Sequence, residues 1–137
     1  MIRSAAAAPW AWCVIPVAAL LLSLTAQGAT LSAAARGEID ALLSRLQSSG
    51  CQFNRNGTWY PPAKAKDHLL RKLEYLEDKG LVDSAEQFIE RGASQSSMTG
   101  RAYLVKCGDA QPVESRAWLT EQLESIRHAG TAAQPKH

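Results

Sequence analysis

A polar stripe that begins with a histidine is the strongest candidate for chemistry in this sequence. His68, Lys72 and Tyr75 stand at positions i, i+4 and i+7, which places them along one side of a helix. Arg55 and Asn56 precede that helix and would join the stripe if their segment folds back onto it. Arginine offers a planar fork of donors for a carboxylate or phosphate, and histidine can donate or accept a hydrogen bond. The group predicts a small site for an anionic or carbohydrate ligand.

The same residues have a plainer interpretation. Polar residues at the rim of a buried helix face are ordinary, so His68 and Tyr75 could simply satisfy backbone groups while Arg55 lies on the surface. Trp59 also has two interpretations. It could stack on a sugar ring or on a partner protein, or it could cover a second small core. These alternatives stay open at the level of the sequence.

A hydroxyl-rich segment supplies a second candidate, a hydrolase site. The hydroxyl residues ahead of Gly100 are Ser94, Ser96, Ser97 and Thr99. A serine nucleophile would need His68 as its base and Glu74 or Glu86 to orient that base. The sequence contains neither a GxSxG motif nor an SxxK pair. We therefore expect a turn here, and the hydrolase remains the alternative function.

The first 28 residues have the features of a signal peptide. Arg3 provides a positive start, residues 5–24 carry no charge, and Ala26 and Gly28 have the spacing that a signal peptidase reads. Cleavage after Gly28 would make the protein periplasmic or secreted. The alternative is an uncleaved membrane anchor, because about twenty apolar residues can span a bilayer. Two prolines within the segment weaken that alternative.

Two cysteines, Cys51 and Cys107, remain once Cys13 is removed with the signal peptide. An even number of cysteines in an oxidising compartment predicts a disulfide. Such a bond would close a long loop, which the chain-entropy model values at roughly 4 kcal/mol. Two free buried thiols are the alternative. Neither cysteine has the neighbours of a metal site, so no metal and no cofactor is expected.

Charge and length narrow the classes of partner. The chain has 15 Lys and Arg residues, including Arg3, against 13 Asp and Glu residues, which is not the basic excess of a nucleic-acid binder. We expect no nucleic acid, and a membrane contact only if the signal segment is uncleaved. The partner would be an unknown envelope protein or a small polar ligand. The 109 residues after Gly28 suffice for one domain.

Apolar spacing and turn residues indicate the elements that position the candidate residues. Residues 30–49 have a helical apolar stripe. Asn56 and Gly57 predict a two-residue hairpin turn, with Phe53 facing Tyr60 across the strands. Two prolines then predict the start of a helix that runs from about residue 61 to residue 79.

The second half of the chain predicts two more helices and a strand. A capping pattern at residues 83–87 favours a short helix that ends near Gly92. Residues 101–107 alternate as a strand does, and residues 115–130 form the last helix, with Trp118 on its core side. We predict one α+β domain over residues 29–129, in which about four helices pack on a small antiparallel sheet made of the hairpin and one strand. A mobile tail over residues 130–137 would follow.

Several segments together are similar to a known family. In chain order they read SGCQFNRNGTWY, AKDHLLRKLEYL, SAEQFIE, SSMTGRAYLVKC and the WL of the last helix. Over roughly residues 38–127 the chain resembles the small exported bacterial proteins grouped as domain of unknown function 5329. The resemblance implies export to the bacterial envelope and fits a Cys51–Cys107 pair. That family has no established activity, so the resemblance transfers no catalytic residue.

These observations predict an uncharacterised envelope protein that acts as a non-enzymatic binding or interaction module. It would use the hairpin and the adjoining helix edge. The predicted ligand-binding residues are Arg55, Trp59, His68, Lys72 and Tyr75. The alternatives are a small periplasmic hydrolase that uses His68 and a structural envelope component without a ligand site.

Overall fold

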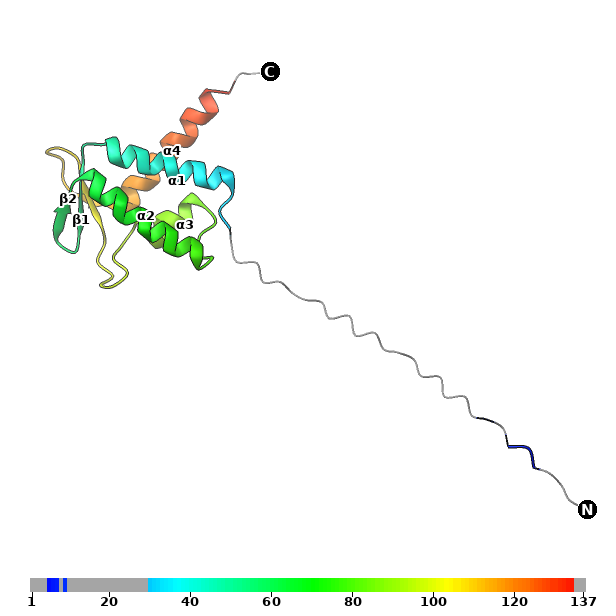
Figure 1. Ribbon diagram of the computed structural model, residues 1–137. Helices are drawn as coiled ribbons and strands as arrows, with labels where there is room; N and C mark the ends of the chain where they lie inside the picture. Colours follow the sequence, from blue (N-terminus) through cyan, green and yellow to red (C-terminus); the bar gives the residue numbers. More distant parts are fainter. Residues whose placement is uncertain (1–4, 8, 10–29, 135–137) are drawn as a thin grey trace, which may run out of the picture.

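A computed structural model describes residues 5–7, 9 and 30–134, and it contains four helices and a four-stranded sheet there. The elements are α1 (Ala33–Ser48), β1 (Gln52–Arg55), β2 (Thr58–Tyr60), α2 (Pro62–Asp78), α3 (Ala85–Gly92), β3 (Leu104–Lys106), β4 (Val113–Glu114) and α4 (Ser115–Ala132). The helices pack together, and the sheet lies at one end of them (Figure 1). The predicted α+β class is confirmed.

Parts of the sequence prediction fall outside the described residues. The proposed cleavage site at Gly28 and almost all of the predicted signal peptide lie there, as do the last three residues of the predicted tail. Helix α4 continues to Ala132, so the residues that open the predicted tail are helical. Among the residues that the structure describes, no helix has the length and apolar character needed to cross a membrane.

The hairpin has the register that its turn predicts. Phe53 pairs with Tyr60, and Asn56 and Gly57 between the strands have φ angles of 51° and 87°. A two-residue turn of this kind needs positive φ at both positions, which asparagine and glycine tolerate best. The sheet order is β2-β1-β3-β4, and every neighbouring pair is antiparallel. Strand β4 was not predicted, because its two exposed residues carry no alternating apolar pattern.

Capping groups explain where the helices begin. The Ser32 hydroxyl accepts the Ala35 N–H at 3.1 Å at the start of α1, and the Ser84 hydroxyl accepts the Gln87 N–H at 3.2 Å at the start of α3. Helix α2 instead begins with Pro62 in its first position, where no N–H partner is required. These local signals are short-range, so the sequence predicted the helix starts to within a few residues.

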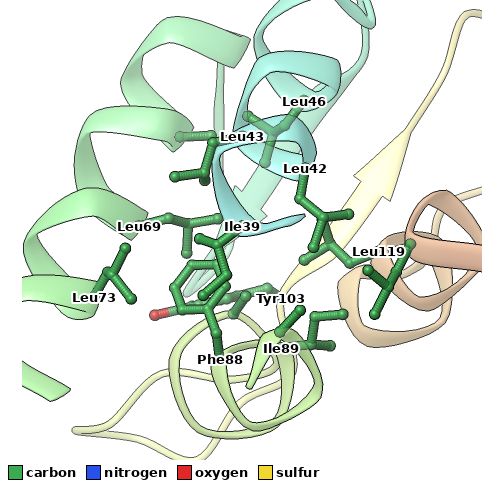
Figure 2. Packing of buried hydrophobic residues seen from close by; sticks show 14 of the residues in the cluster. Ile39, Leu42, Leu43, Leu46, Leu69, Leu73, Phe88, Ile89, Tyr103 and Leu119 are labelled. Atoms are coloured by element: carbon green, nitrogen blue, oxygen red, sulfur yellow. The ribbon is translucent and has the colours of Figure 1, made fainter. Parts of the chain in front are cut away.

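The hydrophobic core forms where the apolar stripes of the helices face one another and the sheet (Figure 2). The best-buried side chains include Ile39, Leu42, Leu43, Leu46, Leu73, Phe88, Val105 and Leu119. Each such side chain contributes about 1.5–3 kcal/mol by leaving water. Trp118 was predicted to be core, but it is only partly buried, and its ring packs edge-to-face on Phe53 with 5.8 Å between centroids.

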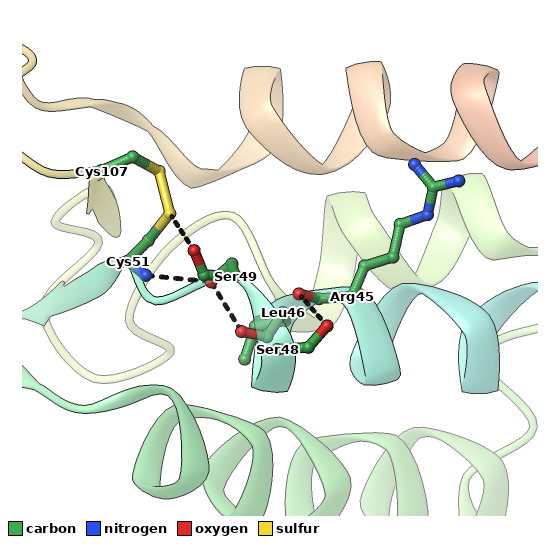
Figure 3. The surroundings of a disulfide bond; sticks show 6 residues. All are labelled: Arg45, Leu46, Ser48, Ser49, Cys51 and Cys107. Atoms are coloured by element: carbon green, nitrogen blue, oxygen red, sulfur yellow. Dashed lines mark hydrogen bonds between the residues drawn. A yellow bond between two sulfur atoms is a disulfide. The ribbon is translucent and has the colours of Figure 1, made fainter.

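The predicted disulfide between Cys51 and Cys107 is present, with a Cα–Cα distance of 4.2 Å. It joins the residue before β1 to the residue after β3, two strands that pair along the sheet. Beside it, the Ser49 hydroxyl donates to the Leu46 carbonyl at 2.8 Å and accepts the Cys51 N–H at 3.1 Å (Figure 3). These bonds fix the turn from α1 into the sheet.

Candidate functional site

A pocket of about 670 Å³ opens between α2, the hairpin and the segment that leads into β3. From α2 it is lined by His68, Arg71, Lys72 and Tyr75. From the hairpin it is lined by Arg55, Asn56, Thr58 and Tyr60. From the segment before β3 it is lined by Ser96, Ser97, Met98 and Tyr103. The volume lies within the range of about 300–1,000 Å³ that is usual for small-molecule sites.

The structure brings four of the five predicted binding residues to this pocket, namely Arg55, His68, Lys72 and Tyr75. Trp59 is not among its lining residues. It pairs with Asn54 in the hairpin, one position from the Arg55–Thr58 pair, and successive residues of a strand point to opposite faces. Its side chain is 37 % exposed, outside the pocket.

A chain of hydrogen bonds crosses the pocket wall. Arg55 Nη1 lies 2.6 Å from His68 Nδ1, and His68 Nε2 lies 3.1 Å from the Tyr103 hydroxyl. Arginine can only donate, so Nδ1 accepts and the hydrogen of the neutral ring is on Nε2. Lys72 Nζ also donates to the Tyr103 hydroxyl, at 3.2 Å, and to the Gln95 carbonyl, at 3.0 Å. The Tyr103 oxygen thus accepts two hydrogen bonds, and its own hydrogen is left to donate.

The local electrostatics agree with a neutral His68. Burial first, and then the positive charges of Arg55, Lys72 and Arg71, together lower the pKa of His68 from 6.5 to about 4. Burial, followed by the charge of Arg55, also lowers the pKa of Lys72. Burial raises the pKa of the Tyr103 hydroxyl, although Arg55 opposes that change. Tyr103 therefore stays a donor at neutral pH.

Positive charge is not balanced within the pocket. Arg55, Arg71 and Lys72 line it, and no aspartate or glutamate does. Arg71 is exposed and has no hydrogen bond or ion pair within residues 30–134. The ion pairs of the described chain join helices elsewhere, as between Arg127 and Glu38. Such a lining suits an anion that has several hydrogen-bond acceptor atoms.

Asn56 connects two walls of the pocket. Its side-chain oxygen accepts a hydrogen bond from the Thr99 hydroxyl at 2.7 Å, and its side-chain nitrogen donates to the Ser96 hydroxyl at 3.3 Å. The Ser96 hydroxyl also accepts the Thr99 N–H at 3.4 Å. The hairpin turn and the segment before β3 are thereby held against each other.

The hydrogen bonds of His68 do not form the arrangement that a serine hydrolase needs. Its two ring nitrogens contact Arg55 and Tyr103, and no serine or carboxylate partner is found for it in the described part of the chain. Glu86, one predicted orienting residue, forms an ion pair with Arg127. Ser96 is buried. Likewise, no group of three or more potential metal ligands occurs in the described ranges.

Sequence reasoning missed several lining residues. Arg71 follows His68 by three positions and precedes Tyr75 by four, so helical spacing could have found it. Tyr103 lies within the strand predicted over residues 101–107, and it was not expected to contribute to the site. It is buried, and its hydroxyl oxygen lies on the side of α2 (Figure 2). No periodic signal in the irregular segment before β3 could have predicted this contact.

Comparison with known proteins gives a family but no activity. The model of a family described as "Family of unknown function (DUF5329)" matches residues 33–127. "Uncharacterized protein YfeK" of Salmonella typhimurium is 42 % identical over 91 residues, which cover 66 % of this chain and 73 % of that protein. No solved structure is significantly similar to the chain. On these matches, the chain belongs to the DUF5329 family of unknown function.

Proposed function

We propose that this protein is a non-enzymatic module that binds a small anionic ligand in the pocket between α2, the hairpin and the segment before β3. The observation that carries the proposal is the lining itself, in which three cations and the Tyr103 donor face a cavity without a carboxylate. Charges of one sign that share a cavity repel each other. A bound anion would relieve that repulsion and accept the available N–H and O–H groups.

The neighbours of Arg55 favour binding rather than catalysis. His68 accepts one N–H of the guanidinium, and Tyr60 lies against it, with Arg55 Cζ 4.9 Å from the ring centroid. A guanidinium that is held in this way loses less conformational entropy when it binds a carboxylate or phosphate. In this proposal His68 is a positioning residue that stays neutral.

An extracytoplasmic location belongs to the same proposal. The Cys51–Cys107 disulfide persists best outside the reducing cytosol, and the first 28 residues have the pattern of a signal peptide. Native mass spectrometry of the protein recovered from its own cell envelope, without reduction, would test this location. A mature chain that begins at Ala29 supports it, and a full-length chain with free thiols contradicts it. The same spectrum would weigh any small ligand that leaves on denaturation.

Arg71 offers the cleanest test of the pocket, because it is exposed and its replacement should not disturb the fold. Arg71→Gln should weaken anion binding about tenfold, the typical worth of a hydrogen bond to a charged group. Thermal unfolding with inorganic phosphate, sulfate or butanoate, at constant ionic strength, measures this effect. An anion at a hundred times its Kd raises the free energy of unfolding by about 2.7 kcal/mol.

Lys106→Gln is the matched control, because Lys106 is an exposed cation on β3 that does not line the pocket. Equal stabilisation of the wild type, Arg71→Gln and Lys106→Gln by every anion would refute the pocket as the binding site.

A protein partner on the hairpin is the second candidate. Strand β2 is an edge of the sheet, and Trp59 on it is partly exposed. Exposed edges can pair with another chain, and tryptophan is enriched at interfaces. Trp59→Ala should abolish capture of such a partner and leave anion binding unchanged, so the two candidates separate in one variant.

A further inference from the structure

A second, smaller hollow adjoins the pocket along the same helix. It has a volume of about 100 Å³ and shares Arg55, Tyr60, His68 and Arg71 with the large pocket. Lys64 and Ala65, from the first turn of α2, extend its lining away from the large pocket. Because four residues line both cavities, the two cavities are neighbours that share a wall.

Positive charge continues into this hollow. Lys64 is exposed and has no hydrogen bond or ion pair within residues 30–134, and the lining again contains no aspartate or glutamate. Arg55 and Arg71 therefore lie between two further cations, with Lys72 in the large pocket on one side and Lys64 in the small hollow on the other. The charges of the whole chain are nearly balanced, yet four cations lie along these two neighbouring cavities.

The two volumes suit different parts of one molecule. A hollow of about 100 Å³ holds a single acid group and little more, whereas about 670 Å³ holds a second acid group together with the body of a small ligand. A ligand with only one acid group would leave one end of the site with unbalanced positive charge.

We infer that the natural ligand is a small organic diacid, with one acid group beside Lys64 in the hollow and the other beside Lys72 in the pocket. This inference rests on the proposed function, because it assumes that the pocket binds anions. Arg55 and Arg71, which line both cavities, would donate hydrogen bonds to the acid groups from the shared wall.

A homologous series of acids tests the inference. The linear dicarboxylates succinate, glutarate, adipate and pimelate are titrated into the oxidised protein at constant ionic strength, and the monocarboxylates of matching length serve as controls. Amide chemical shifts report the weak affinities expected of such simple probes. A ligand that spans two fixed cavities should show an optimum of chain length among the diacids. The best diacid should shift the signals of Lys64 and Ser97 at the same concentration.

Lys64→Gln supplies the deciding variant, and Lys66→Gln is its matched control. Both substitutions remove one positive charge near the start of α2, but Lys66 donates to Gln47 of α1 at 2.7 Å and lines neither cavity. Lys64→Gln should weaken binding of the best diacid about three- to fivefold and leave the monoacids unchanged, since an exposed charge pair is worth up to about that much. Lys66→Gln should change neither.

The outcomes separate this inference from the proposed function. If monoacids and diacids bind equally well and respond alike to Lys64→Gln, the diacid inference is overturned while an anion pocket stands. If the diacids show no length dependence, it is also overturned. If neither kind of acid binds to the wild-type protein, the proposed function fails and the inference fails with it.

Discussion

Lowering the pH tests the hydrogen bond between Arg55 and His68, because protonation of His68 removes the nitrogen lone pair that accepts the arginine N–H. The pKa of His68 is about 4 in the folded protein, against 6.5 for an ordinary histidine. Between these values the unfolded chain binds the proton and the folded chain does not. The stabilising effect of neutral His68 is therefore fully present above pH 6.5 and is lost as the pH falls to about 4.

The size of this effect follows from the pKa difference. At about 1.4 kcal/mol for each pKa unit, a fall from 6.5 to about 4 corresponds to roughly 3 kcal/mol. His68 is only partly buried, and solvent screens the charges around it. We therefore expect a loss of about 1–2 kcal/mol from His68 between pH 7 and pH 4.5.

Urea unfolding of the wild type and of His68→Gln at both pH values measures this loss. Glutamine keeps a carbonyl acceptor for Arg55 but does not titrate, so carboxylates that titrate in both proteins cancel in the comparison. The wild type should lose about 1–2 kcal/mol more than the variant on acidification. Equal losses in the two proteins, or a midpoint near 6.5 for His68 in an NMR titration, would refute the tautomer and the network inferred from the structure.

Two further predictions concern the fold that supports the site. Gly92→Ala should lower the free energy of unfolding by about 1–3 kcal/mol, because the added Cβ would lie 3.0 Å from the fully buried ring of Phe88, which would have to shift within the core. An unchanged urea midpoint would contradict this packing. Replacing both Cys51 and Cys107 by serine should cost about 4 kcal/mol, given their separation of 56 residues. That loss should match the effect of reducing the wild type, and a loss below about 1 kcal/mol would show that the bond does not constrain the unfolded chain.

Local signals explain how much of the fold could be predicted. The hairpin register follows from two turn residues, because a two-residue loop leaves only one way to pair the flanking strands. The apolar stripe of α2 similarly predicts that Leu69, Leu73 and Leu76 are buried. Strand β4 forms because it pairs with β3, and the types of its own two residues do not indicate that pairing.

The candidate site could likewise be predicted from the sequence only in part. Helical spacing places His68, Lys72 and Tyr75 together, and the hairpin needs only to fold back for Arg55 to reach them. The contribution of Tyr103 depends on the path of an irregular segment, which the sequence does not specify. Strand alternation directs Trp59 to the face opposite Arg55, as the hairpin turn predicts, so Trp59 could serve only a contact on that other face.

The position of the disulfide determines how the pocket walls can separate. Because β1 and β3 are antiparallel, Cys51 and Cys107 lie at one end of their ladder, while Arg55 and Tyr103 lie at the other. The disulfide therefore links the two strands at the end of the ladder that lies away from the pocket-lining residues Arg55 and Tyr103. Three residue pairs lie between the disulfide and these two residues, so the covalent bond and the strand pairing together limit how far Arg55 and Tyr103 can move apart. In a reduced chain, the strand pairing and the hydrogen bonds of Asn56 to Ser96 and Thr99 would hold these walls without the covalent link.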